Sequence, residues 1–441
     1  MPDSRSVIVE TRRIPGARRL RGLLAEPAVR VSWTAVWSSR LVVLAAGVLA
    51  VLAFHRAPGT AGFDPSGVTA PFGYFGNLLA APFARWDSAW YLTIAQIGYD
   101  HDPSRTAFFP LYPVLFHWLG FVVGSDLVAG VLVSLGSFFV ALVVLYRLTR
   151  LELGEDLAPV TVMLIAFSPM AFFFSAVYSE GLFLALSVGC IWQARIGRWM
   201  WAGVLGGLAA AERNSGVMLL VPIVLLFLYG PREDAVARIR AATESRLARL
   251  RPRYRLTPKL GWALLVPAGL AAYVLVLALT TGDGLAPFRS QEVWFRHFAG
   301  PLGGIWDGAV AAWDGLRQLL HGPPPPLYFA KAAGDPMAIA GQNLMLFAFL
   351  GVGIAAIVGT FRRLPFAYGA YCVAALTLPL SYPVTPRPLI SVPRYEVVLF
   401  PLFMWGAWWI ARRRWTVPAI ASGAVLLGLF TAEFATWRFV A

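Results

Sequence analysis

The stretch Arg85–Tyr91 (Arg-Trp-Asp-Ser-Ala-Trp-Tyr) places a carboxylate, a cation and three aromatic rings in one short polar segment. Asp87 and Tyr91 are spaced i, i+4, so on a helix they would share one face. Partial desolvation of a carboxylate at the start of such a helix makes it a stronger general base. The structural alternative is that Asp87 caps the helix and that Arg85 is its ion-pair partner.

The rest of the chain is mostly apolar. It has 441 residues, of which 58% are hydrophobic and 14% charged, and its mean hydropathy is +0.65. These values predict an all-α polytopic membrane protein. The net charge of +14 is concentrated in basic clusters that flank apolar segments, which is typical of cytoplasmic segments and argues against nucleic-acid binding. The strong preference for arginine over lysine suggests a bacterial source with a GC-rich genome.

The apolar segments predict about eleven membrane spans. They lie near residues 37–54, 127–147, 158–176, 178–196, 199–211, 214–229, 261–281, 341–360, 365–381, 395–411 and 416–434. The positive-inside rule then places the N-terminus in the cytoplasm and both long polar-aromatic loops outside. This count requires that Pro110–Gly124, which is short and contains His117, lies in the outer headgroup region as an interfacial helix.

This topology divides the chain into segments with different expected roles. Residues 1–35 form a basic cytoplasmic tail and residues 36–441 a transmembrane domain. Within that domain, 55–126 is the first outer loop, 230–260 a basic cytoplasmic loop and 282–340 the second outer loop. Trp306-Asp307 and Trp313-Asp314 in the second outer loop predict an amphipathic helix that acts as a lid.

Few residues suggest a metal or redox centre. Cys190 and Cys372 both fall inside apolar segments and are expected to be packed thiols. Asp100-His101-Asp102 has ligand-type side chains, but three consecutive residues seldom converge on one ion, so a solvated turn before Pro103 is predicted. No metal site and no cofactor are therefore predicted, and dependence on a divalent metal stays open. No glycine-rich nucleotide loop is present in the sequence.

Several motifs together resemble the PIG-V family, the mannosyltransferases of GPI-anchor assembly and their bacterial relatives within the GT-C glycosyltransferases. The resemblance extends from about residue 80 to 411. The matching segments are Trp86-Asp87 with Trp90-Tyr91, Ile94-Ala95, Gly98-Tyr99, Phe108–Pro113, Ser168-Pro169, Phe173–Glu180, Arg213–Gly216, Pro393–Tyr395 and Leu399–Phe403.

This resemblance implies a GT-C-like fold and an inverting transfer of a sugar, most simply mannose, from a polyprenyl-phosphate donor at the extracytoplasmic face. Asp87 matches the family's outer-loop carboxylate and would accept the proton of the acceptor hydroxyl or orient that hydroxyl. Arg213 and Arg394, with Arg85 third, would stabilise the leaving phosphate, because guanidinium groups bind phosphate in a bidentate manner. The alternatives are that Arg213 snorkels to lipid headgroups and that Arg394 is an interfacial anchor.

The same resemblance adds further substrate-binding candidates, namely Tyr91, Asn214 and Tyr395. Glu180 would either hold Arg213 or act directly. The expected partners are membrane lipids, the polyprenyl-phosphate sugar, and an acceptor that is a glycolipid, a glycan or a protein. Two rival functions are also considered for a protein with many membrane spans: a transporter of lipids or small solutes, and a non-catalytic scaffold of an envelope-assembly complex. The transporter does not account for the two long aromatic outer loops or for the ordered motifs.

Overall fold

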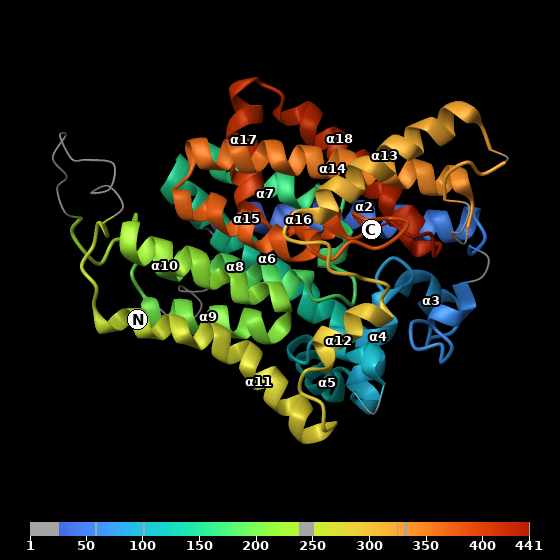
Figure 1. Ribbon diagram of the computed structural model, residues 1–441, viewed down its shortest axis with the longest axis horizontal. Coiled ribbons are helices and arrows are strands. Elements are labelled where there is room, and N and C mark those ends of the chain that lie inside the picture. Colours follow the sequence, from blue (N-terminus) through green and yellow to red (C-terminus); the bar gives the residue numbers. More distant parts are fainter. Residues whose placement is uncertain are drawn as a thin grey trace, which may run out of the picture.

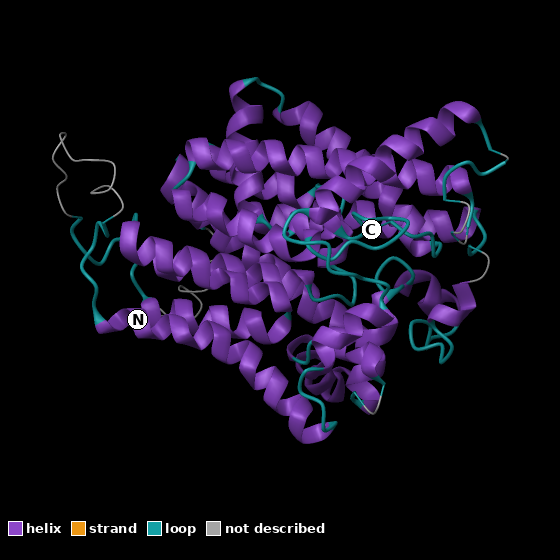
Figure 2. Ribbon diagram, viewed as in Figure 1, coloured by secondary structure: helices purple, strands orange, loops and turns teal. Residues whose placement is uncertain are grey.

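The structure is a computed structural model that describes residues 26–57, 60–99, 102–237, 251–323, 325–329, 332 and 334–440. The regular secondary structure of the described residues is all helical, joined by loops, and these residues contain no strand, only one isolated antiparallel bridge between Arg296 and Val384 (Figure 2). The predicted all-α class is confirmed for these residues. Residues 1–25 of the predicted tail, residues 238–250 of the loop at 230–260, and Asp100 and His101 lie outside the described residues.

Five helices are long and apolar enough to cross a membrane. They are α2 (Pro27–Ala53), α6 (Asp126–Leu153), the continuous helix that ends in α11 (Leu265–Thr280), α14 (Pro336–Arg363) and α18 (Thr416–Ala435). Large apolar side chains such as Leu275 and Leu279 are exposed on α11, as a lipid-facing surface requires. The chain is an integral membrane protein, although the predicted number of eleven spans is not confirmed.

Shorter helices fill the space between these five. They are α7 (Leu157–Ala166), α8 (Glu180–Arg195), α9 (Trp199–Glu212), α10 (Leu220–Tyr229), α15 (Phe366–Leu380), α16 (Val392–Val397) and α17 (Phe400–Arg412). α2 begins at Pro27, so residues 27–35 of the predicted tail are helical; proline at the first helical position favours this start.

Helices α6, α8, α9 and α11 pack side by side in that order (Figure 1). Glycine makes the closest approach possible: a Cβ added at Gly269 of α11 would lie 1.9 Å from the carbonyl oxygen of Gly207 on α9. Small residues at such crossings allow helix backbones to touch, which is the usual way that helices associate in membranes. The inner helices that carry candidate site residues are thereby held firmly against each other.

The first outer loop forms α3 (Tyr74–Ala80), α4 (Asp87–Ile97) and α5 (Leu111–Val123). Gly98, at a φ of +70°, ends α4, and Gly124, at a φ of +82°, ends α5. α5 is too short to span a bilayer, and its Trp118 and Phe121 side chains are exposed. These features agree with the predicted interfacial helix.

The second outer loop contributes α12 (Ala286–Val293) and α13 (Gly303–His321). α12 packs against the turn at Pro103–Ala107 of the first loop, so the two loops meet (Figure 1). α13 lies along α14 and leaves Trp306 and Trp313 exposed. The predicted amphipathic helix is therefore present, packed on one side and open on the other.

A buried, irregular segment, Phe167–Ser179, joins α7 to α8. Arg40 of α2 satisfies its backbone: Nη1 donates to the Ala171 carbonyl oxygen at 2.7 Å, and Nη2 to that of Ala166 at 3.3 Å. Non-helical backbone inside a membrane protein must find such partners, because lipid offers none. This arginine therefore fixes the segment that leads into Tyr178, Ser179 and Glu180.

Candidate active site

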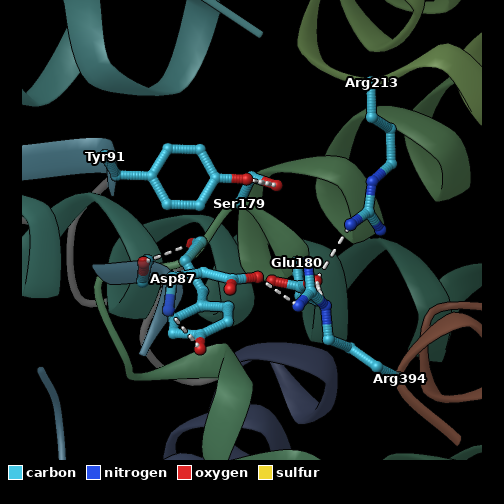
Figure 3. Close-up of polar contacts among 8 residues, drawn as sticks. Asp87, Tyr91, Ser179, Glu180, Arg213 and Arg394 are labelled. Atoms are coloured by element: carbon cyan, nitrogen blue, oxygen red, sulfur yellow. Dashed lines mark hydrogen bonds and ion pairs between the residues drawn. The ribbon is translucent and has the colours of Figure 1, made fainter. Parts of the chain in front are cut away.

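Asp87 is the first residue of α4, and its carboxylate points away from its own helix. Trp86, the preceding residue, has a φ of +54° and makes no side-chain cap. The Asp87 backbone N–H donates to the Tyr178 hydroxyl at 3.1 Å. Its carboxylate accepts a hydrogen bond from Arg394 Nη1 at 2.5 Å (Figure 3). Asp87 is therefore the partner of a distant arginine, not the helix cap that the structural alternative predicted.

Glu180 lies between two arginines and connects them. It begins α8, and its side chain has no exposed surface. One oxygen, Oε1, accepts from Arg394 Nε at 2.7 Å and from Arg213 Nη2 at 2.9 Å (Figure 3). The result is a continuous chain of ion pairs from Asp87 through Arg394 and Glu180 to Arg213. These four residues are named the acid–base cluster below.

Arg394 is held on α16, a short helix outside the candidate spans that starts after Ser391 at a φ of +68°. Its guanidinium carbon lies 5.2 Å from the centre of the Tyr178 ring. Burial acts to lower the pKa of Arg394, but the Glu180 and Asp87 carboxylates outweigh burial and raise that pKa well above its ordinary value. Arg394 therefore stays charged while it bridges two carboxylates.

Arg213 follows the last residue of α9 and precedes the 3₁₀ turn Asn214–Leu219. Its guanidinium lies between the rings of Phe183 and Tyr395, at 5.1 and 5.7 Å. Its Nη1 atom is buried and has no hydrogen-bond partner within the described part of the chain. One donor of a buried cation is thus left available, which is costly unless a ligand or water completes it.

Gly216 allows the turn after Arg213 to fold back on α9. A Cβ at this position would lie 2.1 Å from the Ala209 carbonyl oxygen, and neighbouring backbone atoms cannot move away easily. We expect Gly216→Ala to shift Arg213 and to lower any activity that depends on this site at least tenfold, because small misplacements of reacting groups are costly. Gly136→Ala on α6, where a Cβ meets nothing within 4 Å, is the control. Equal activity of both purified variants would contradict this role.

Tyr91, Asn214 and Tyr395 are also near the cluster but have different environments. The buried Tyr91 hydroxyl donates to Ser179 Oγ at 3.0 Å, so it reaches the residue before Glu180 and not Asp87 itself. Asn214 and Tyr395 line a cavity of about 180 Å³. Its other walls are mostly apolar and come from α11, α12 and the end of α15.

Arg85 is not part of the cluster. Its Nε donates to the Ala435 carbonyl oxygen at 3.1 Å, and its guanidinium lies 5.3 Å from the Trp437 ring. Arg85 does not pair with Asp87, as the structural alternative predicted, because Asp87 pairs with Arg394 instead. Arg85 instead fixes the C-terminal segment against the first outer loop.

Three residues of the site were given no role by sequence analysis: Tyr178, Ser179 and Glu212. Tyr178 and Ser179 belong to the Phe173–Glu180 motif, so their position was signalled but their contacts were not. Glu212 is 1% exposed and lies next to Arg213. Nothing in its sequence context distinguishes a buried glutamate from one at a solvated turn.

The described residues contain no group of three or more His, Cys, Asp or Glu side chains placed to hold a metal ion. Cys190 and Cys372 are both buried and free, as predicted. The charges of the acid–base cluster are instead balanced by two arginines.

Comparison with known proteins adds an independent observation. Residues 38–223 match the family described as Mannosyltransferase (PIG-V). GPI alpha-1,6-mannosyltransferase 2 of Mus musculus is 30% identical over 158 residues, which cover 32% of this chain and 31% of that protein. The same enzyme of Cricetulus griseus is 33% identical over 156 residues, covering 32% and 30%. The chain thus aligns with about a third of the length of these relatives.

Among solved structures, the oligosaccharyltransferase of Archaeoglobus fulgidus has a TM-score of 0.42 and 14% identity, covering 79% of this chain and 48% of that one. A likeness at this level does not assign a fold. The matched region 38–223 contains Asp87, Glu180 and Arg213, three of the four members of the acid–base cluster. The resemblance inferred from the motifs is therefore confirmed: over residues 38–223, this chain is similar to the PIG-V mannosyltransferase family.

Proposed function

We propose that this protein is a membrane glycosyltransferase that moves mannose from a polyprenyl-phosphate donor to an acceptor hydroxyl. The acid–base cluster is the observation that carries this proposal. It joins a partly exposed carboxylate, whose side chain is 26% exposed, to the buried Arg213 and to Arg394, whose side chain is 13% exposed, and both arginines come from distant parts of the chain. A general base next to cations is what transfer from a phosphate leaving group needs.

In the proposed reaction, Asp87 takes the proton from the acceptor hydroxyl as its oxygen attacks the anomeric carbon of the sugar. The bond from that carbon to the donor phosphate breaks on the opposite side, so the configuration inverts. The lipid phosphate leaves with the electron pair. Arg394 and the free Nη1 of Arg213 stabilise its negative charge.

The cavity beside the cluster supports a lipid-linked donor. Tyr395 lines the cavity and also contacts Arg213, so the cavity and the cluster share a wall. Phe109, Leu270 and Phe288 make the lining apolar, and Arg296 adds a cation. An apolar pocket that contains a cation suits the phosphate end of an isoprenoid chain.

We further propose that the site faces the extracytoplasmic side of a bacterial cell membrane, with the N-terminus in the cytoplasm. The positive-inside distribution of arginine supports this orientation. The two loops that meet at α12 would then lie outside and receive the acceptor, which is a glycolipid, a glycan or a protein. The donor lipid is the co-substrate, and no further cofactor is invoked.

The test uses purified full-length protein in lipid vesicles with polyprenyl-phosphate-mannose that carries a radiolabel in the sugar. We expect label to move to an extracted glycolipid, glycan or protein, and the new linkage to have inverted configuration. Movement of intact donor across the vesicle membrane without transfer would support the transporter instead. Absence of both activities, with acceptor from the native membrane supplied, would support the scaffold.

A further inference from the structure

The Glu212 carboxyl group is buried without a partner. Glu212 is the last residue of α9 and is 1% exposed. Neither of its carboxyl oxygens has a hydrogen bond among the described residues. A buried carboxyl with two unsatisfied oxygens needs an explanation, because native proteins seldom leave such groups unpaired. Its place beside Arg213 connects it to the acid–base cluster.

The cations near Glu212 already form ion pairs with other carboxylates. Arg394 contacts both Asp87 and Glu180, and Arg213 contacts Glu180, so two arginines balance two carboxylates. A third carboxylate would leave the cluster with one excess negative charge away from water, which is unfavourable. The charge count therefore favours a neutral carboxylic acid at Glu212.

The surroundings of Glu212 agree with this count. From the neighbouring elements it is faced by Arg213, Glu180, Arg394, and the hydroxyl groups of Ser179 and Tyr91. Burial raises the pKa of Glu212 to about 8, and the Arg213 charge opposes burial only in part. The Ser179 hydroxyl lies beside the carboxyl without hydrogen-bond geometry in this conformation.

We propose that protonation of Glu212 controls binding of the anionic donor. As a neutral acid, Glu212 leaves the free Nη1 of Arg213 available to the donor phosphate. As a carboxylate, it competes for that N–H group and repels the phosphate. This inference rests on the proposed function, since it names how the same site recognises its charged substrate.

The kinetic test compares the donor KM of wild type and Glu212→Gln between pH 7 and pH 9, using polyprenyl-phosphate-mannose. The donor is a phosphodiester and does not titrate in this range. We expect the wild-type KM to rise about tenfold, as one group with a pKa near 8 requires, and the Glu212→Gln KM to stay flat. An equal rise in both proteins would overturn the proposal.

Glu396→Gln is the matched control. Glu396 is also buried, at 8% exposed, and its Oε1 has no hydrogen-bond partner in the described chain. However, its carboxyl packs against Gly353 of α14, and Arg213 and Glu180 are not among the groups around it. We expect this variant to keep the wild-type rise of KM with pH. If the KM of Glu396→Gln no longer rose with pH, Glu396 and not Glu212 would be the titrating group, and the proposal would be wrong.

Infrared spectroscopy of the protein without substrate separates this inference from the proposed function. We expect a carboxylic-acid carbonyl band that decreases between pH 7 and pH 9 in wild type and is missing from Glu212→Gln. Finding Glu212 ionised at pH 7 would overturn the proposal, whatever the protein transfers. If the band were observed but the protein did not bind the donor, the proposed function would be contradicted, while the protonation of Glu212 would be established.

Discussion

Replacing Asp87 with asparagine should lower kcat for sugar transfer by about 10²- to 10⁴-fold, the usual contribution of a general base. Asparagine has nearly the same shape, and its carbonyl oxygen can still accept the hydrogen bond from Arg394 Nη1. Its amide cannot take a proton from the acceptor hydroxyl. The loss should therefore fall on kcat, with the donor KM and the temperature of unfolding little changed. Initial rates and thermal unfolding of the purified variant measure all three.

Asp102→Asn provides the control for this experiment. Asp102 lies in the same outer loop, caps the turn at Pro103–Ala107 and pairs with Arg105 at 3.4 Å, away from the acid–base cluster. Losing a carboxylate from this loop should therefore not affect kcat by itself. A folded Asp87→Asn protein with near-normal kcat would show that Asp87 is not the base, and the family-based assignment of the residue would be wrong.

Sequence patterns could predict the members of the site but not their pairing. Asp87, Glu180, Arg213 and Arg394 all stand in motifs, because these motifs combine charged and aromatic residues in an otherwise apolar chain. The structural alternative paired Asp87 with Arg85, its near neighbour. The actual partner is 307 residues away. Spacing along the chain reveals pairs within one helix, whereas this pair depends on how α4, α8 and α16 pack.

The span count shows a second limit of sequence reasoning. Apolar segments at 158–176 and 178–196 each suggested a complete span, but α7 ends at Ala166 and buried irregular backbone continues to Ser179. Hydropathy is equally high in a helix and in irregular backbone that is buried by protein. Arg40 stands in the basic N-terminal part of the sequence, yet it is buried in α2 and donates hydrogen bonds to this segment. The need for an internal partner depends on the fold and cannot be seen in composition.

Replacing Arg394 should weaken donor use more than any other single change at the site. Its guanidinium holds two carboxylates at once, through Nε to Glu180 and Nη1 to Asp87. Arg394→Lys keeps the charge but provides one compact ammonium group that cannot reproduce this fork. We expect the donor KM to rise about a hundredfold, or about 3 kcal/mol, within the range for breaking a buried charged contact. The acceptor KM should change much less.

Arg394→Ala should also destabilise the fold. It leaves the Asp87 carboxylate without a cation and leaves Glu180 with Arg213 alone, and removing one partner of a buried ion pair costs about 3–5 kcal/mol. Adding Asp87→Asn removes one of the uncompensated charges and should restore part of this stability. A thermal-unfolding double-mutant cycle would measure that coupling. Independent, additive losses would mean that Asp87 and Arg394 do not interact.

The kinetic outcome distinguishes a phosphate contact from an interfacial anchor. Arg387→Lys is the matched control, since Arg387 lies shortly before α16, bonds to Gln342 and does not touch the cluster. An anchor at position 394 would position the whole site, so its loss would raise the donor and acceptor KM values equally. Loss of a residue that binds the leaving phosphate raises the donor KM selectively, because only the donor carries the phosphate charge. Equal changes in Arg394→Lys would therefore rule out the phosphate contact even if activity were low.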